Sequence, residues 1–417
     1  MAGKNEKTPG TTRRQFLKTT GAALAVAAVT PHLEREEGMA AKTPAKKVRI
    51  GVVGGGFGRD FQWHEHPDCI VEAVSDLRPD RRKALQETYQ CAKSYDSLEE
   101  LIKDPKVDAV AVFTGAPDHV RHDVACLKAG KHVISAVPAC VSVAEAEELV
   151  DCVRKTGLTY MMAETSYYHQ TVISARKFLA EGRFGNIFYT EAEYHHAGME
   201  GLWREADGRS TWRHGFPPMR YPTHCTAYLV GLTRERLVEV MSIGWGPKEY
   251  APWLPNPYRN PMMCETALFK TDKGNAMRVA IFWYGAHRGC ERGQWYGDKM
   301  SFFGPHPHGV GPVIVRTGGQ TEKDAGGFDR QLAPFEPYRQ PEWWKTDLLP
   351  EPLRHASGHE GSHTFLTHEF IDALVHDRQP AVNVYEALAM TVPGIIAHES
   401  SMAGGRQMSI PVFDPKA

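Results

Sequence analysis

Histidine and tyrosine side chains gather in two short segments in the middle of the chain. Tyr194 and His196 lie in one segment, and Tyr221 precedes His224 by three residues in the other. An imidazole accepts a proton near neutral pH, and a phenol can donate a hydrogen bond to a developing carbonyl oxygen. These four side chains therefore predict acid–base chemistry on a hydroxyl or carbonyl group.

His224 begins an apolar stretch, 225–232, that favours a helix. A helix N-terminus lowers the pKa of an imidazole, so we expect His224 to be neutral and able to accept a proton. Glu164 ends the last strand predicted in the first half of the chain, and we expect it to bind neighbouring hydroxyls in the same site. The predicted catalytic residues are Glu164, Tyr194, His196, Tyr221 and His224.

A glycine-rich turn, GGGFGR over 54–59, follows the first predicted strand. Glycines let the backbone approach a pyrophosphate, and we expect a helix after the turn to present its N-terminal amide groups. Asp76 ends the second strand, where a carboxylate binds ribose hydroxyls and favours NAD over NADP. The turn predicts a cofactor site that contains Gly54, Gly56, Phe57, Gly58 and Asp76.

A second motif, HEGSH over 359–363, matches the zinc-peptidase pattern H-E-x-x-H. That chemistry requires both histidines one turn apart on a single helix. Glycines flank this segment, and Ser362 is predicted to cap a helix that starts at Thr364. His359 would then lie outside the helix, so we predict no metal site.

Short β-branched segments alternate with helical segments between residues 48 and 165. Such alternation is typical of a doubly wound parallel sheet, the Rossmann type. Later segments predict a mostly antiparallel sheet with helices, a hairpin at 272–274 and long surface loops over 302–352. The predicted strands of the first half are 48–54, 70–76, 109–114, 132–137 and 160–165, and its helices are 80–89, 98–103, 119–129 and 143–155. In the second half the predicted strands are 186–195, 237–243, 265–270 and 276–283, and the helices are 172–181, 225–232, 364–375 and 384–401.

The composition excludes some classes of partner. With a formal net charge of −1 and no run of basic residues, the chain has no general attraction to nucleic acid, and we predict no such partner. None of the eight cysteines forms a Cys-x-x-Cys pair, which argues against a zinc ribbon or a redox dithiol. Most are expected to be buried, and one disulfide is left open.

The N-terminal sequence Thr12–Lys18 (TRRQFLK) precedes a mildly apolar run at 21–29. Paired arginines before a weak hydrophobic segment are typical of a twin-arginine export signal; the alternative is a disordered basic tail. The run is shorter than the roughly 20 residues that span a bilayer. We therefore predict a signal and linker over 1–46, recognition by the twin-arginine machinery, and a periplasmic or otherwise exported protein without a stable membrane span.

Several motifs together resemble the Gfo/Idh/MocA oxidoreductase family: the glycine turn, Asp76, TGAPDH over 114–119, Pro138 and His224. The resemblance implies a Rossmann domain over 47–168 and an α/β domain with a mostly antiparallel sheet over 169–417. It implies NAD or NADP as cofactor, a sugar or polyol substrate and a homo-oligomer. Further cofactor-binding positions implied by the resemblance are Thr114, His119, Ala136 and Val137.

The chain departs from that family at two catalytic positions. Ordinary members have Glu-Lys-Pro where this chain has Ala136-Val137-Pro138, and they commonly have Asp at the position of Arg220. The segments VPA, MMAE, EYHH and YPTH are similar to exported NAD-dependent α-N-acetylgalactosaminidases, which also lack the lysine. In that comparison the five predicted catalytic residues match positions that line the sugar pocket.

Three hypotheses follow for the function. The first is an NAD(P)-dependent oxidoreductase that oxidises a ring hydroxyl of a sugar or glycoside, with His224 or His196 as the base. The second is a redox-neutral glycoside hydrolase or lyase, in which transient oxidation allows elimination and NAD stays bound. The third is a non-catalytic protein that binds a sugar or a nucleotide.

Overall fold

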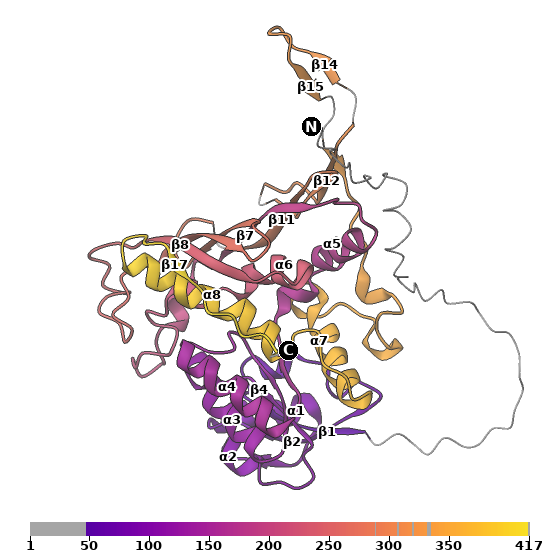
Figure 1. The fold of residues 1–417 in the computed structure, drawn as a ribbon. Helices are drawn as coiled ribbons and strands as arrows, with labels where there is room; N and C mark the ends of the chain where they lie inside the picture. Colours follow the sequence, from indigo (N-terminus) through magenta and orange to yellow (C-terminus); the bar gives the residue numbers. More distant parts are fainter. Residues whose placement is uncertain (1–46, 288, 307, 319–320, 332–334, 416–417) are drawn as a thin grey trace, which may run out of the picture. The chain divides into compact units, whose positions relative to one another are not determined.

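The computed structural model (Figure 1) describes residues 47–415 apart from 288, 307, 319–320 and 332–334. The predicted signal and linker at 1–46 lie outside the described residues. The expected boundary near residue 168 and the expected homo-oligomer stay predictions. No helix in the described part of the chain has both the length and the apolar character needed to cross a membrane.

The first sheet is parallel and has the strand order β3-β2-β1-β4-β5-β6. It confirms the predicted Rossmann-type architecture. All four residues of β4 are buried, as expected of a strand covered on both faces. The strands are β1 (Val48–Val53), β2 (Cys69–Ser75), β3 (Ser94–Tyr95), β4 (Ala109–Val112), β5 (His132–Ser135) and β6 (Tyr160–Met162), and the helices are α1 (Pro79–Tyr89), α2 (Leu98–Leu101), α3 (His119–Lys128) and α4 (Val143–Thr156).

The prediction of a helix directly after the glycine turn is wrong. The connection from β1 to β2 contains only a 3-10 turn at Gly58–Asp60, followed by further turns. Phe61 and Trp63 are fully buried there, and the Phe61 ring stacks on Phe113 at a centroid distance of 4.5 Å. Aromatic side chains thus cover this part of the sheet in place of a helix. The glycine turn is therefore not followed by a helix N-terminus.

The second sheet has nine strands in the order β16-β13-β12-β11-β7-β10-β9-β8-β17. Only β7 and β10 are parallel neighbours among its described strands, so the predicted mostly antiparallel sheet is confirmed. The segment 302–352, expected to be loops, also contributes strands and a separate ribbon, β14–β15. The bounds are β7 (Ile187–His195), β8 (Leu237–Trp245), β9 (Cys264–Thr271), β10 (Ala276–Phe282), β11 (Cys290–Gly297), β12 (Met300–Phe303), β13 (Val313–Arg316), β14 (Thr321–Lys323), β15 (Asp329–Gln331), β16 (Glu336–Pro337) and β17 (Met408–Ser409).

Helices α5 (Gln170–Ala180), α6 (Thr223–Thr233) and α8 (Val384–Met402) lie along one face of this sheet (Figure 1). Every residue of α6 except Thr233 is buried, because the helix packs between the sheet and α8. This burial explains the apolar stretch 225–232 and fixes His224 in the first turn of α6, beside β7 and β11.

Helix α7 (Gly358–Val375) begins differently from the prediction. Residues 359–361 have left-handed backbone angles, and regular helix follows only after them. The predicted cap Ser362 has no hydrogen-bond partner for its buried Oγ. The Oγ of Ser357 instead accepts a hydrogen bond from the backbone N–H of Thr364 (3.2 Å). His359 lies outside the regular helix, as expected.

All eight cysteines are free thiols, and six of them are buried. The disulfide that the sequence left open is therefore not formed. Burial of small apolar thiols fits the expectation that these cysteines act as core residues.

Substitution of Gly54 tests whether the glycine turn needs its first glycine. Its φ is +98°, and a Cβ placed there would lie 2.2 Å from the carbonyl oxygen of Phe113. Gly54→Ala should therefore lower the free energy of unfolding by more than about 2 kcal/mol. At the control position Gly130, φ is +77° and a Cβ would meet nothing within 4 Å. Gly130→Ala should lower the free energy of unfolding by only about 1 kcal/mol. Chemical denaturation of both variants measures the difference.

Candidate active site

A buried ion pair between Glu164 and His224 is the centre of the site. Glu164 follows β6 at the carboxyl edge of the parallel sheet, and His224 Nδ1 lies 2.8 Å from its Oε1. The side chain of Glu164 is 0% exposed and that of His224 is 6% exposed. The pair thus joins the end of the Rossmann sheet to the first turn of α6.

Three further polar residues complete this cluster, and the sequence reasoning missed them. Ser166 donates a short hydrogen bond to Glu291 Oε1, which lies 3.6 Å from His224 Nδ1 and 3.4 Å from His169 Nε2. Glu291 is on β11, directly opposite Tyr194 of β7. No motif marks Glu291, because its place depends on a strand pairing that the sequence pattern did not reveal.

The predicted tyrosines and histidines do come together around the ion pair. The Tyr194 ring lies 4.8 Å from the ring of His224, 5.7 Å from His196 and 6.2 Å from Tyr221, measured between centroids. Tyr221 lies 5.3 Å from His224. The guanidinium of Arg213, another residue the sequence reasoning missed, lies 6.0 Å from the centre of the Tyr221 ring. One polar face therefore presents two phenols, two imidazoles and a cation.

The expectation that His224 is neutral is wrong. Burial lowers its pKa, but attraction to Glu164 and Glu291 and the hydrogen bond to Glu164 outweigh burial and raise the pKa to about 9. Burial raises the pKa of Glu164, yet its interactions with His224 lower it below the ordinary value. Two carboxylates overcome the effect of the helix N-terminus, so His224 is an imidazolium at neutral pH. Its Nε2–H donates to no group of the described residues.

The glycine turn offers a cradle for an anion even without a helix. Asp76 Oδ2 accepts the Gly55 amide (2.7 Å) and closes the turn. The amides of Gly56 and Phe57 donate to no group in the part of the chain that the structure describes. A Cβ at Gly56 would meet only the Arg81 guanidinium, at 3.9 Å. The turn therefore fits NAD, with these amides and Arg81 on the pyrophosphate and the remaining lone pairs of Asp76 on the ribose.

The other predicted cofactor positions lie at the carboxyl ends of β4 and β5. Thr114 follows β4, and its Oγ1 is 2.9 Å from His122 Nδ1. His119 is 1% exposed, with its two ring nitrogens 2.8 Å from the Pro138 carbonyl and 3.1 Å from the Thr114 carbonyl. It holds two strand ends together and offers no free nitrogen to a ligand. Ala136 and Val137 are both buried and follow β5.

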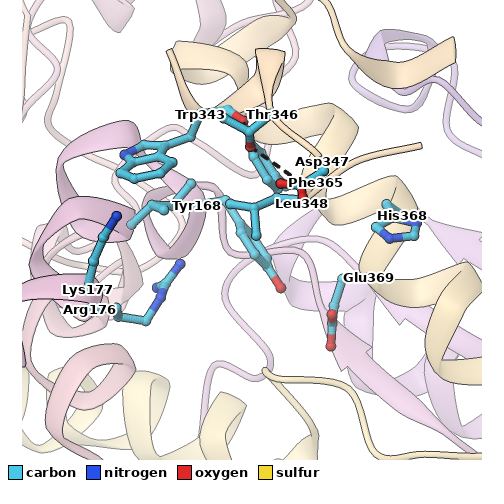
Figure 2. A pocket seen from close by; sticks show the side chains of 11 residues that line it. Tyr168, Arg176, Lys177, Trp343, Thr346, Asp347, Leu348, Phe365, His368 and Glu369 are labelled. Carbon is cyan, nitrogen blue, oxygen red and sulfur yellow. Dashed lines mark hydrogen bonds between the residues drawn. The ribbon is translucent and has the colours of Figure 1, made fainter. Parts of the chain in front are cut away.

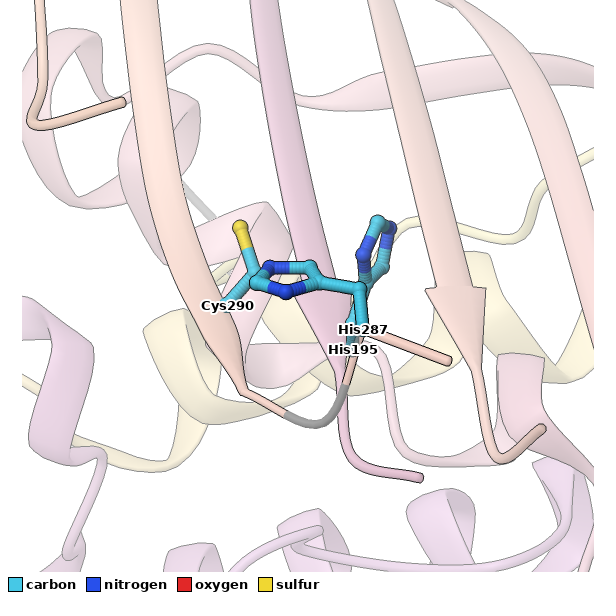
Figure 3. Close-up of side chains that lie close together, drawn as sticks. All are labelled: His195, His287 and Cys290. Atoms are coloured by element: carbon cyan, nitrogen blue, oxygen red, sulfur yellow. The ribbon is translucent and has the colours of Figure 1, made fainter. Parts of the chain in front are cut away.

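Two groups in the described residues have the chemistry of metal ligands. One is the Glu164–His224–Glu291 cluster, where the His224 cation already balances one carboxylate. The other is His195, His287 and Cys290, at the ends of β7 and β11 (Figure 3). Burial and the carboxylate of Glu193 raise the pKa of the Cys290 thiol to about 11, which disfavours the thiolate that a metal needs. In the first group the carboxylate of Glu291 therefore remains without a full counter-charge, while the second group is neutral as long as its thiol keeps its proton.

A cavity of about 560 Å³ lies apart from this cluster (Figure 2). Its wall includes Tyr168, Trp343, Phe365 and the cations Arg176 and Lys177, and none of the predicted catalytic residues. The cations are already placed over aromatic rings: Arg176 lies 4.2 Å from the Tyr167 ring and Lys177 5.4 Å from the Trp343 ring. We therefore place the chemistry at the ion pair and not in this cavity.

Comparison with known proteins agrees with the geometry. Residues 48–164 match the model of the Gfo/Idh/MocA oxidoreductase family, an NAD-binding Rossmann fold. These residues are therefore similar to the NAD-binding domain of that family. The matched segment carries the glycine turn, Asp76 and Glu164.

Individual relatives differ in how much of this chain they match. A glycosyl hydrolase family 109 protein of Solibacter usitatus is 26% identical, over 97% of each chain. Myo-inositol 2-dehydrogenase of Thermotoga maritima is 34% identical, over 27% of this chain and 34% of its own. A levoglucosan dehydrogenase solved with NADH and levoglucosan shares the fold with a TM-score of 0.69, at 16% identity over 88% of this chain and all of its own.

The ion pair predicts a stability that depends on pH. The pKa of His224 is about 9 in the folded protein and 6.5 when unperturbed. Its contribution should be complete below pH 6.5 and disappear as the pH rises through about 9, a loss of up to about 3 kcal/mol. Chemical denaturation at several pH values between 6 and 10 measures this change in the free energy of unfolding. His224→Gln should remove the pH dependence in this window; an unchanged slope in that variant would contradict the assignment.

Proposed function

We propose that the protein uses bound NAD to oxidise a ring hydroxyl of a sugar or glycoside. The observation that supports this most is the buried Glu164–His224–Glu291 cluster, which lies at the carboxyl edge of the same sheet as the glycine turn. Ligands of open α/β sheets bind at that edge. When bound, NAD supplies a hydride acceptor, and the side chains of the chain handle the proton and the hydroxyl groups.

In this proposal His224 replaces the lysine that the chain lacks. Val137, at the lysine position, is buried and carries no charge. The imidazolium of His224 presents a free Nε2–H, which can donate to the substrate oxygen as a carbonyl develops. Tyr194 and Tyr221 add phenolic donors beside it. The charge that favours the carbonyl oxygen therefore comes from the first turn of α6 and not from the end of β5.

A second candidate function is redox-neutral cleavage of a glycoside. A relative that matches nearly the whole chain is a glycosyl hydrolase family 109 protein, whereas the myo-inositol dehydrogenase matches 27% of this chain. Oxidation next to a C–H bond acidifies it, so a base can expel the glycosidic group, water can add, and the ketone can be reduced again. The buried charged cluster of Glu164, His224 and Glu291 favours an enzyme, so it gives no support to the hypothesis of a non-catalytic binding protein.

Incubation of the purified protein with NAD and a panel of sugars and aryl glycosides tests both functions. NADH formed in proportion to product indicates net oxidation, while aglycone release without net NADH indicates cleavage. His224→Gln should reduce either activity by at least about 100-fold, because it removes the cation and leaves NAD binding in place. If NAD does not bind to the wild-type protein, the proposal fails.

We also propose export through the twin-arginine pathway. The support is the sequence of residues 12–29, which lies outside the described residues. Export of a folded protein suits an enzyme that loads its cofactor before it leaves the cytoplasm. Replacement of Arg13 and Arg14 together by lysine should retain the protein in the cytoplasmic fraction, and normal export of that variant would contradict the proposal.

A further inference from the structure

The loop that opens α7 holds its backbone in an unfavourable conformation next to the site. His359 has φ 48° and ψ 61°, Glu360 has φ 56° and ψ 33°, and Gly361 has φ 86°. Residues other than glycine rarely adopt such backbone angles, and backbone strain of this kind concentrates at functional sites. The Glu360 carbonyl accepts a hydrogen bond from Gln170 Nε2 (3.0 Å), which holds the loop against the start of α5.

A chain of hydrogen bonds fixes the tautomer of His359. His363 Nδ1 lies 2.9 Å from the backbone carbonyl of Asp60, which can only accept, so this nitrogen carries the proton. Burial lowers the pKa of His363, and a neutral ring leaves its Nε2 unprotonated. That Nε2 is 2.9 Å from His359 Nδ1, which must donate to it. His359 Nε2 is then left with a free lone pair.

His359 lies between the cofactor turn and the catalytic cluster. Its ring contacts Phe57 of the glycine turn edge-on, at a centroid distance of 5.6 Å. On the other side, Glu360 Oε2 lies 3.9 Å from His169 Nδ1, and His169 contacts Glu291. As a whole residue His359 is exposed to solvent, although protein groups surround its ring.

We propose that Nε2 of His359 accepts the proton of the substrate hydroxyl. This step rests on the oxidation proposed above. The O–H bond breaks and its proton moves to Nε2, while the hydride of the adjacent C–H bond passes to NAD+; the alcohol is oxidised and NAD+ is reduced. No product of the step needs a further oxidant.

The charges around the ring suit this role. Burial and repulsion from His363, His224 and His169 lower the pKa of His359 to about 4, with Glu291 acting in the opposite direction. The ring is therefore unprotonated at neutral pH, whereas His224 already holds its proton. Burial also lowers the pKa of His196, but no hydrogen-bond chain of the described residues fixes its tautomer, and its buried Nδ1 has no partner.

The role can be tested with variants that keep the left-handed backbone. Asparagine tolerates these angles and retains a donor toward His363 but cannot accept a proton. His359→Asn should bind NAD normally and lose at least about 100-fold in kcat. His66 is the matched control: it is buried, pairs with His368 (3.1 Å), and burial and His368 lower its pKa to about 4. His66→Asn should leave kcat unchanged.

Two readouts separate proton acceptance from a structural role. Imidazole added to His359→Gly should restore part of the lost activity, because glycine suits the backbone and leaves room for the base. His363→Gln removes a repelling ring, so the acid limb of the kcat/KM profile should move to higher pH. Activity of His359→Asn within threefold of wild type, or loss of the acid limb in His196→Asn alone, would overturn the proposal.

The tautomer can be measured without any substrate. Nitrogen-15 spectra of histidine-labelled protein at pH 7, assigned by comparison with His359→Asn, should show a proton on Nδ1 and none on Nε2. A protonated Nε2 would overturn the inference even if the substrate panel gave no product. If the wild type forms no NADH and releases no aglycone while this tautomer is present, the proposed function fails and the placement of the base stands.

Discussion

The buried contact between Glu164 and His224 is the constraint on which the rest of the site depends. A carboxylate with no exposed surface is costly unless a cation neutralises it, and His224 is the cation within reach. The contact fixes where α6 starts relative to the end of β6. It also determines the charge of His224, since two carboxylates outweigh burial and the helix N-terminus.

In the proposed mechanism, two histidines with opposite pKa shifts take the acid and base roles. His224 lies among carboxylates and keeps its proton, while His359 lies among other histidines and loses it. Enzymes assign acid and base roles by such differences of environment. In the proposed mechanism the His224 cation takes the place of the lysine that the resemblance implies at position 137, where Val137 is buried.

On the cofactor side of the protein, aromatic packing takes the place of the helix that was expected after the glycine turn. Phe57, Phe61 and Phe113 pack together where a helix was expected, and His363 stacks on Phe61 at 4.6 Å. The same aromatic cluster supports the glycine turn and the histidine pair of α7. The anion cradle therefore consists of amides in a turn and an arginine, and the loop of α7 borders the cofactor turn directly.

The parallel sheet, most helices and strands, and the residue types of the site could be predicted from the residues alone, because burial imposes periodicity on strands and helices and because glycine turns have few alternatives. The sequence also placed Tyr194, Tyr221 and His224 correctly as neighbours of Glu164. The tertiary structure decided what depends on long-range contacts: the strand pairing that brings Glu291 opposite Tyr194, the missing helix after the turn, and the protonation of His224. A pKa depends on charges a few ångströms away, and Glu164 and Glu291, which are 60 and 67 positions from His224 along the chain, supply them only after folding.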